Sequence, residues 1–390
     1  MKKRLLFVIP SLRSGGAEKS LVTLLQLLDS TRFDVDLLLF RRDGLFLSQV
    51  PQWVRVLDAG ADYAAFDSPI SASVRYFLRR GKFLQAVRRL CYGRLMRSGR
   101  ADVPQRSWKY IGRFLPRLRG YDAAIAYLEG TSTYYVVDRV QAGRKLAFLH
   151  TDYERLLPRR DMDAPYYEKI DCLIGVSQAC TARAEAAFPF LRGKTATMHN
   201  LIAPTVLRAM AGADTHFPRD GVPNLLTVGR LSAPKGIDIA VRACGELKRR
   251  GVCLRWYHLG VGEMRGEIET LIDAEDVRGC FFLLGERENP YPYFRQCDVY
   301  VQPSRFEGKS IAVDEAKCFA RPIVVTDFGT VRDQIGDGVT GLVAEKTPQS
   351  VADAVERLLR SPELCRTLSD NLGREQLGNA EEIETLYALL

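Results

Sequence analysis

The sequence predicts an α/β protein with two doubly wound domains. Short apolar runs recur along the chain, and each is followed by a polar or glycine-containing loop and then by apolar residues at helical spacing. This alternation is typical of parallel sheets covered by helices on both faces. The chain has 390 residues, a length that exceeds the usual size of a domain with a single core, and 46% of the residues are hydrophobic. We therefore expect two domains.

The first domain is predicted to cover residues 1–203. A loop with Gly15 and Gly16 follows the first apolar run, and a helix begins after it. Backbone amides can approach a ligand closely there, although a pair of glycines is more often only a turn. His150 follows a later run, at the edge where ligands bind, although a lone loop histidine is usually incidental. The strands of this domain are expected at residues 5–9, 35–40, 123–127, 145–149 and 173–177.

The beginning of the chain imitates a signal peptide. Three basic residues precede an apolar run, but that run stops at Pro10 and is too short for the hydrophobic region of a signal sequence. Nine cysteines are scattered without a CxxC pair, which argues against a disulfide framework and a zinc site. No apolar run approaches the roughly 20 residues of a membrane-spanning helix. We expect a cytoplasmic protein, soluble or peripheral on the inner face of the plasma membrane.

Residues 71–120 form a strongly basic helical insertion in the first domain. Fourteen basic residues stand there against one acidic residue, a net charge of +13 in a chain whose total is +9. The bases alternate with aromatic and aliphatic residues, as in amphipathic helices that lie on anionic membranes. A solvated basic face on ordinary packed helices is the main alternative, and nucleic-acid binding is the least favoured. We expect an anionic membrane surface as a partner, and no nucleic acid.

The second domain is predicted to cover residues 204–375. Its first loop contains Arg230 and Lys235, five positions apart between two glycines. Glycines permit close approach, arginine can bind phosphate oxygens in a bidentate way, and lysine supplies a point charge, so a diphosphate fits. Solvated cations in a turn are the alternative. A glycine loop at 260–266 has one residue too many for a dinucleotide fingerprint. The strands are expected at residues 224–228, 254–259, 281–284, 299–301 and 323–326.

A second candidate site follows the strand at 299–301. Glu307 and Glu315 have seven residues between them, and a helix is expected to begin near Ser310 and Ile311. Free amides at that helix start would favour an anion, and the two glutamates would frame it. A carboxylate near a helix start is also stabilised by the helix dipole alone, by roughly 0.3 to 1 kcal/mol.

Taken in order, these motifs resemble the retaining family 4 glycosyltransferases of the GT-B fold, of the bacterial glycan-assembly type. In that family, two Rossmann-like domains face each other across a cleft, and a C-terminal helix, here residues 376–390, returns to the first domain. The two-glutamate spacing carries most of the resemblance. The other matching motifs are Gly15-Gly16, Val228-Gly229-Arg230, Lys235-Gly236, Asn289-Pro290 to Tyr293, and Pro303 to Gly308.

The resemblance implies a retaining hexosyltransferase that needs no metal. It would move a hexose or an N-acetylhexosamine from a nucleotide sugar, in the first place a UDP-sugar, to a lipid-linked glycan acceptor in bacterial cell-surface polysaccharide assembly. Glu307 would lie against the donor sugar, His150 would contact the sugar or diphosphate from the first domain, and Glu315 would hold the ribose. Donor binding is further implied for Gly16, Arg230, Lys235, Glu286, Arg287, Asn289, Gly308, Lys309, Ser310 and Ile311.

One position departs from the family pattern. Lys309 stands where small or aromatic residues are frequent, and it would either add a third cation near the diphosphate or point to solvent. Two DxD sequences, residues 34–36 and 161–163, have the form found in metal-dependent glycosyltransferases. The former lies inside a predicted strand and the latter in a charged loop, so we expect no metal and no cofactor.

Two other classes of protein stay open at this point. A nicotinamide-dependent oxidoreductase would also be doubly wound, but it should carry a GxGxxG sequence after an early strand, and the first loop lacks it. A non-catalytic basic membrane-surface module would explain the basic insertion. Such a module would not explain the two cations and the two glutamates of the second domain.

Overall fold

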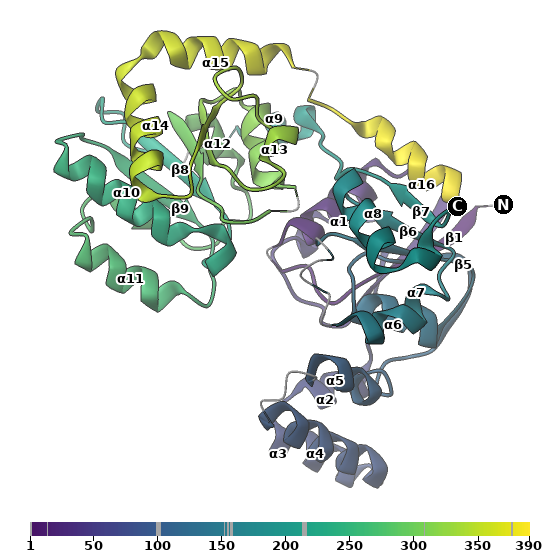
Figure 1. Ribbon diagram of the computed structural model, residues 1–390. Coiled ribbons are helices and arrows are strands. Elements are labelled where there is room, and N and C mark those ends of the chain that lie inside the picture. Colours follow the sequence, from purple (N-terminus) through teal and green to yellow (C-terminus); the bar gives the residue numbers. More distant parts are fainter. Residues whose placement is uncertain are drawn as a thin grey trace. The chain divides into compact units, whose positions relative to one another are not determined.

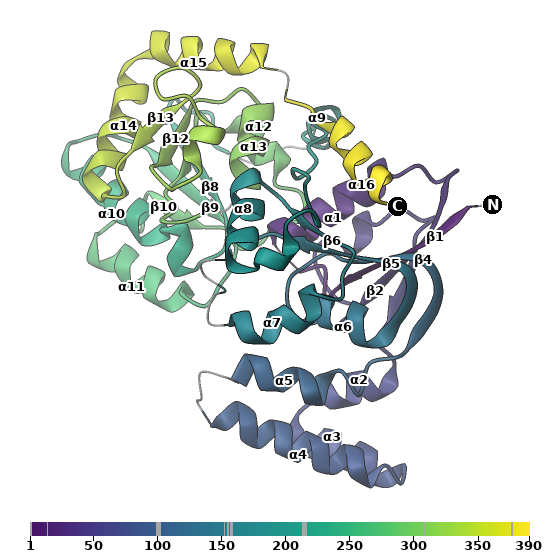
Figure 2. The same ribbon diagram turned by 45° about the vertical axis from the view of Figure 1, so that its right-hand side comes forward.

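The computed structural model describes residues 2–13, 15–98, 103–151, 153, 156, 159–212, 217–307, 309–375 and 377–390 (Figures 1 and 2). The chain forms two compact units. The first comprises Met1–Arg13, Ala17–His199 and Glu381–Leu390, and the second comprises Ser14–Gly16 and Asn200–Ala380. Each unit is built around one parallel sheet.

The sheet of the first unit has seven parallel strands in the order β3-β2-β1-β4-β5-β6-β7. Strands β1 and β4 pair directly, and the strand order reverses between them. The loops that follow these two strands therefore leave in opposite directions at the carboxyl edge of the sheet, which is the place where open α/β sheets bind ligands. The strands are β1 (Lys3–Ile9), β2 (Phe33–Leu39), β3 (Arg55–Asp58), β4 (Leu118–Ala126), β5 (Val140–Leu149), β6 (Cys172–Gly175) and β7 (Thr195–Thr197).

Helices fill the connections of this unit. They are α1 (Gly16–Leu27), α2 (Ala61–Asp67), α3 (Ile70–Arg79), α4 (Phe83–Arg97), α5 (Val103–Ile111), α6 (Thr131–Arg139), α7 (Arg160–Tyr167) and α8 (Gln178–Ala187). The basic insertion corresponds to α3, α4 and α5, and it ends before residue 120 because β4 already begins at Leu118. Phe77, Trp108 and Phe114 are buried and join these helices to the core of the unit.

The sheet of the second unit has six parallel strands in the order β10-β9-β8-β11-β12-β13. They are β8 (Asn224–Val228), β9 (Arg255–Leu259), β10 (Phe281–Leu283), β11 (Val299–Gln302), β12 (Ile323–Thr326) and β13 (Leu342–Ala344). Its helices are α9 (Pro204–Met210), α10 (Ile237–Arg249), α11 (Arg265–Ala274), α12 (Tyr291–Gln296), α13 (Ile311–Cys318), α14 (Pro348–Arg360) and α15 (Pro362–Arg374).

Alternation along the strands divides the core of the second unit into two layers. On β11, Val299 and Val301 join one hydrophobic cluster, and Tyr300 between them joins the other. Residues of α10, α11 and α14 complete the first cluster, whereas residues of α9, α12 and α13 complete the second. Because successive strand side chains point to opposite faces, helices must cover both faces of this sheet.

Helix α16 (Ile383–Leu389) belongs to the first unit. The Tyr387 hydroxyl accepts a hydrogen bond of 3.0 Å from the Asp29 amide, and the Arg32 guanidinium lies 4.6 Å from the centre of the Tyr387 ring. The Lys3 ammonium donates to the Leu390 carbonyl at 2.8 Å. The end of the chain is thus held on the unit with which the chain begins.

The predicted fold class is confirmed: both sheets are parallel, and helices alternate with strands throughout. Every strand expected from an apolar run exists, with ends shifted by a few residues. Strands β3, β7 and β13 were not predicted. They have only three or four residues each, too few to show an apolar pattern of their own. Within the described residues, no helix is both long and apolar enough to cross a membrane.

Candidate active site

The loops after β8 and β11 meet at the point where the strand order of the second unit reverses. Strands β8 and β11 are neighbours, so the loop 229–236 and the loop 303–310 leave the same edge of the sheet. The Arg305 amide donates to the Pro234 carbonyl at 2.8 Å, and the Arg305 guanidinium is paired with Asp238 at 2.6 Å. These contacts hold the two loops together, at the place where open α/β sheets bind ligands.

Gly236 is required for this close approach. Its φ is +64°, and a Cβ atom added there would stand 2.0 Å from the carbonyl oxygen of Pro303. We expect Gly236→Ala to lower the free energy of unfolding by at least about 2 kcal/mol, because both the left-handed backbone and the clash are unfavourable. Denaturant unfolding measures this change. Gly266→Ala is the control, since a Cβ there meets nothing within 4 Å, and an equal loss in both variants would contradict the argument.

Glu307 is largely buried in the loop after β11 and is held from several sides. Its Oε1 accepts hydrogen bonds from Lys235 Nζ at 2.7 Å and from Ser304 Oγ at 2.7 Å. Gln302 Nε2 lies 3.4 Å from the same oxygen and 2.8 Å from Ser304 Oγ, and its own Oε1 accepts from the Tyr300 hydroxyl. The carboxylate is thus fixed in position before any ligand arrives. Residues Gln302 and Ser304 were not recognised in the sequence as supports of Glu307.

Arg230 differs from Lys235 in its surroundings. Lys235 is paired with Glu307, whereas Arg230 is exposed and makes no ion pair or side-chain hydrogen bond within the described residues. An exposed guanidinium at the carboxyl edge of a sheet retains all of its donors for a ligand. Both predicted cations therefore lie on the loop after β8, where one is already engaged with a carboxylate and the other is available.

Glu315 lies within α13 and is 4% exposed. The Tyr291 hydroxyl of α12 donates to its Oε1 at 3.3 Å. Burial and the neighbouring Glu315 carboxylate raise the pKa of Tyr291 well above its usual range, so the hydroxyl keeps its proton. Tyr291 was not predicted to belong to the site, because it lies 24 positions before Glu315 and nothing in the sequence between them indicates that α12 and α13 are neighbours.

The predicted anion site at the start of α13 requires two free amides, and this prediction is wrong for one of them. The Ser310 amide is not free, because it donates to Gln334 Oε1 at 2.9 Å, and Gln334 Nε2 donates back to the Ser310 carbonyl at 2.8 Å. A side chain distant in sequence thus caps the helix. Ile311 is the first residue of the helix itself. Lys309 is paired with Asp314 at 3.5 Å, and Gly308 lies outside the described residues.

The loop after β10 carries three residues for which donor binding is predicted, Glu286, Arg287 and Asn289. Glu286 is half-buried and Arg287 is exposed, with its Nε 3.2 Å from the Tyr293 hydroxyl. The side chain of Asn289 makes two hydrogen bonds within the protein: its Nδ2 donates to the Met210 carbonyl at 2.7 Å, and its Oδ1 accepts from the Tyr291 amide at 3.2 Å. These two bonds join α9 to the start of α12.

The glycine loop at 260–266 has a packing role. Gly260 has a φ of +141°, and a Cβ atom there would lie 2.0 Å from the Gly229 carbonyl oxygen. The Gly260 amide donates to the Gly285 carbonyl at 2.9 Å. This glycine therefore lets three neighbouring loops stack on one another, which accounts for its presence without a dinucleotide.

Gly16 begins α1, the helix after β1, and His150 follows β5 in the first unit. The ring of His150 stacks on Phe148 at 5.9 Å and lies 5.1 Å from the Tyr127 ring. Burial lowers the pKa of His150 to about 4, against the opposing charge of Glu129, so the ring is neutral at physiological pH. Its Nε2 is buried and finds no hydrogen-bond partner among the described residues.

One carboxylate of each DxD sequence is engaged with neighbouring side chains. Asp36 lies in β2, with Arg55 Nε at 2.7 Å and the Tyr121 hydroxyl at 2.6 Å. Asp163 lies in α7, not in a loop as predicted, and accepts from the hydroxyls of Tyr134 and Tyr153. Among the residues that the structure describes, no three His, Cys, Asp or Glu side chains are grouped so that they could hold a metal ion.

His258 is a buried titratable residue on β9, fully inaccessible to solvent. Burial lowers its pKa from 6.5 to about 4. Between these values the unfolded chain binds a proton that the folded chain excludes, so we expect stability to fall as the pH falls from about 6.5 to about 4. The slope is about 1.4 kcal/mol per pH unit for one such group. Denaturation midpoints of His258→Gln should depend less steeply on pH, and an unchanged slope would contradict this assignment.

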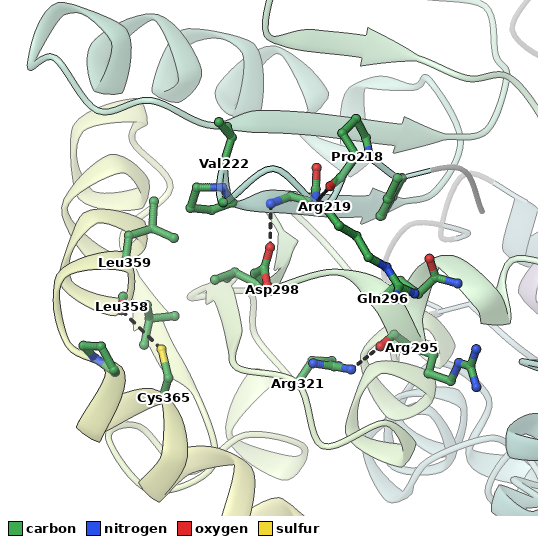
Figure 3. Close-up of a pocket in the computed structure, with 16 residues that line it drawn as sticks. Pro218, Arg219, Val222, Arg295, Gln296, Asp298, Arg321, Leu358, Leu359 and Cys365 are labelled. Atoms are coloured by element: carbon green, nitrogen blue, oxygen red, sulfur yellow. Dashed lines mark hydrogen bonds between the residues drawn. The ribbon is translucent and has the colours of Figure 1, made fainter. Parts of the chain in front are cut away.

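A cavity of about 850 Å³ lies in the second unit, at the opposite edge of the sheet (Figure 3). It is lined by Asn224 and Val299, which begin β8 and β11, and by Leu358 and Cys365 from the last two helices of the unit. Since a strand rises about 3.3 Å per residue, four or five residues separate this cavity from the carboxyl edge by roughly 15 Å. It is therefore distinct from the site around Glu307.

Comparisons with known proteins find glycosyltransferases that are similar to this chain. Residues 214–374 match the family model described as glycosyl transferases group 1. The chain is 36% identical over 156 residues to an alpha-D-kanosaminyltransferase of Streptomyces kanamyceticus, covering 39% of this chain and 40% of the relative. It is 26% identical over 346 residues to the N-acetylgalactosamine-N,N'-diacetylbacillosaminyl-diphospho-undecaprenol 4-alpha-N-acetylgalactosaminyltransferase of Campylobacter jejuni, covering 88% of this chain and 86% of the relative.

Solved structures show the same fold over the whole length. The Anabaena protein Alr3699/HepE, in complex with UDP and glucose, superposes with a TM-score of 0.72 at 15% identity and covers all of both chains. The lipopolysaccharide glycosyltransferase WaaG superposes with a TM-score of 0.62 at 13% identity and covers 98% of both chains. This chain matches only 40% of the length of the kanosaminyltransferase and 34% of the length of an amylovoran biosynthesis glycosyltransferase of Erwinia amylovora. The second unit therefore matches the glycosyl transferases group 1 family, and the whole chain has the two-domain GT-B fold of the solved structures.

Proposed function

We propose that the protein transfers a sugar, with retention of anomeric configuration, from a nucleotide sugar to a glycan acceptor. The observation that carries this proposal is a fixed, buried carboxylate, Glu307, which is paired with Lys235 at the switch point of the second sheet, where the loop after β8 also presents the exposed cation Arg230. A carboxylate alone would suit many reactions. The combination suits a donor that carries both a diphosphate and a sugar.

The cations would bind the diphosphate. Arg230 has donors available for two phosphate oxygens, and Lys235 supplies a point charge beside them. As the glycosidic bond breaks, negative charge develops on the leaving nucleoside diphosphate, and preorganised positive charge stabilises it most at that moment. The Ile311 amide, at the start of α13, and Gly16, at the start of α1, would add weaker support through the positive ends of their helices.

Glu307 would act at the sugar. Positive charge develops at the anomeric carbon as the leaving group departs, and a nearby carboxylate stabilises it. Lys235 Nζ, 2.7 Å from the Glu307 carboxylate, holds that carboxylate in its orientation. Because both groups are held before binding, little reorganisation is needed during the reaction.

The remaining predicted residues would recognise the rest of the donor. Glu315, supported by Tyr291, would hold the ribose hydroxyls, since a buried carboxylate accepts two such hydrogen bonds. Glu286 and Arg287, in the loop after β10, would flank the base. His150 would contact the donor as a neutral imidazole and not as a cation, given its lowered pKa.

The donor and the acceptor are proposed from relatives. UDP is bound by the Anabaena protein, and the Campylobacter relative acts on a diphospho-undecaprenol acceptor, as their names state. We therefore propose a UDP-hexose or UDP-N-acetylhexosamine as donor and a lipid-linked glycan as acceptor, in bacterial surface polysaccharide assembly. The protein would act at the inner face of the plasma membrane.

A binding panel tests the proposal. We expect thermal stabilisation by UDP and a UDP-sugar, less by GDP- and ADP-sugars, and none by NAD, since the glycine loop at 260–266 serves packing. The same shift should persist with EDTA, because two cations neutralise the diphosphate. Product analysis with radiolabelled donor and undecaprenyl-linked glycans then tests transfer. Stabilisation by NAD alone would contradict the proposal, and loss of donor binding in EDTA would contradict its metal-independence.

A further inference from the structure

Exposed large hydrophobic side chains gather on helices α3 and α4. Of eleven such side chains within the described residues, six lie between positions 78 and 96. Soluble proteins expose single apolar residues everywhere, but a contiguous group marks an interaction surface. The six, with their exposed fractions, are Leu78 (47%), Phe83 (65%), Leu84 (58%), Val87 (54%), Leu90 (46%) and Met96 (50%).

Four of these side chains share one face of α4. Positions 83, 84, 87 and 90 recur at intervals of three and four residues, so they form a continuous strip, which we call the apolar ridge. The opposite face of α4 is buried at Ala86, Arg89 and Gly93. Figures 1 and 2 both show α3 and α4 side by side, farther from the sheet of the first unit than α5 is.

The orientation of α4 is fixed from its buried side. Arg89 is only 8% exposed and donates to the carbonyl oxygens of Phe66 at 2.8 Å and Ser68 at 3.0 Å. Its guanidinium also lies over the Phe66 ring at 5.3 Å. A buried arginine with these partners anchors the helix, and the apolar ridge must consequently face away from the core.

Helices α3 and α4, which form the surface around the apolar ridge, contain basic residues and no acidic residue, and Lys82 between them is paired with Asp62 of α2. No acidic residue occurs between Asp67 and Asp102. Arg75, Arg79 and Arg94 are exposed and make no ion pair within the part of the chain that the structure describes. The surface therefore combines apolar area with uncompensated cations.

We propose that the apolar ridge and the arginines around it dock on an anionic lipid bilayer. The ridge would enter the region between headgroups and acyl chains, and the arginines would remain with the anionic headgroups. A second copy of this surface is disfavoured, since two arrays of like charge would face each other. A nucleic acid would pair with the arginines but would leave Phe83 and Leu84 in water. The inference concerns a surface separate from Arg230 and Glu307, and it extends the proposed function by bringing the enzyme to lipid-linked acceptors.

Vesicle flotation tests the docking. The full-length protein should float with vesicles that contain phosphatidylglycerol and not with vesicles of pure phosphatidylcholine. Raising the salt concentration from about 0.1 M to about 1 M should release the protein, because the Debye length falls from about 10 Å to about 3 Å. Arg79→Gln and Arg94→Gln should each weaken binding by about fivefold. Arg192→Gln, at an exposed position of the same unit, should have no effect. Equal binding to both vesicle types at either salt would overturn the proposal.

The apolar ridge has a closely matched control. Val87 is 54% exposed on α4, and Val339 is 55% exposed in the second unit. Val87→Ser combined with Leu90→Ser should weaken binding to anionic vesicles at least about tenfold, whereas Val339→Ser should leave it unchanged. If both changes weakened vesicle binding equally, the role of the ridge in lipid binding would be overturned. The same holds if the wild type formed a salt-resistant dimer that the ridge variant does not form.

Insertion into the bilayer is tested by fluorescence. Tryptophan fluorescence of Phe83→Trp should be quenched by brominated lipid in anionic vesicles, and Phe190→Trp, 38% exposed in the same unit, should show only the quenching of the wild type. Equal quenching in both variants would overturn insertion. Arg230→Gln, which weakens the proposed donor site, should bind vesicles like the wild type. Failure of the sugar transfer and failure of the docking are therefore distinguishable.

Discussion

Glu307→Gln is expected to lower the turnover number of sugar transfer by about 10² to 10³. The loss of one preorganised electrostatic group typically has this effect when charge develops in the transition state. Glutamine keeps the size of the side chain and can still accept from Ser304, so the loop after β11 should retain its shape. What disappears is the negative charge that we propose to act at the anomeric carbon, and with it the partner of Lys235. Initial-rate kinetics with a labelled donor measure the effect.

Two measurements separate this loss from misfolding. The affinity of Glu307→Gln for UDP should stay within a few-fold of the wild type, because the nucleotide lacks the sugar. Glu345→Gln, at an exposed position of the same unit, should keep full activity. If Glu307→Gln transferred sugar at the wild-type rate, the carboxylate would have no role at the sugar and the proposed mechanism would be wrong.

Arg230→Gln is expected to raise the Michaelis constant for the donor by about 10- to 100-fold. A hydrogen bond to a charged group contributes about 1.5 to 3 kcal/mol, and each 1.4 kcal/mol corresponds to a factor of ten. Because Arg230 is exposed and has no partner within the described residues, its removal should leave the unfolding free energy within about 0.5 kcal/mol of the wild type. Isothermal titration with UDP and denaturant unfolding measure the two quantities.

Lys235 and Arg219 provide the comparison. Lys235→Met should weaken donor binding and also disturb Glu307, since the 2.7 Å ion pair is lost. Arg219→Gln alters an arginine that lines the cavity at the amino edge of the same sheet, and donor affinity should not change. A reduction of UDP affinity in Arg219→Gln as large as in Arg230→Gln would point to a general effect of charge and against a specific diphosphate site.

The positions of the two cations and of Glu307 could be predicted because strand ends can be read from the sequence. Residues that directly follow β8 and β11 must emerge at the carboxyl edge of a parallel sheet, whatever the rest of the chain does. The apolar runs that mark these two strands are short but uninterrupted. The contrast between Arg230 and Lys235 could not be predicted in this way, because it depends on which partner each side chain meets.

Side chains that support the site from a distance were missed. Gln334 closes the start of α13 from 24 residues away and occupies the Ser310 amide, which we had expected to be free for an anion. Tyr291 supports Glu315 from a separate helix. Neither contact follows from spacing, since each joins elements whose proximity is a product of how the helices cover the sheet.

By itself, the sequence determined two parallel sheets, the edge of the second sheet at which we propose that the donor binds, and the charges placed there. These features follow from local order along the chain: an apolar run becomes a strand, and the loop after it opens at one edge. The tertiary structure decided the rest. It paired Lys235 with Glu307, capped Ser310 with Gln334, and turned the apolar ridge of α4 outward while Arg89 was buried beneath it. Such contacts depend on packing between segments far apart in the chain, and no local pattern records them.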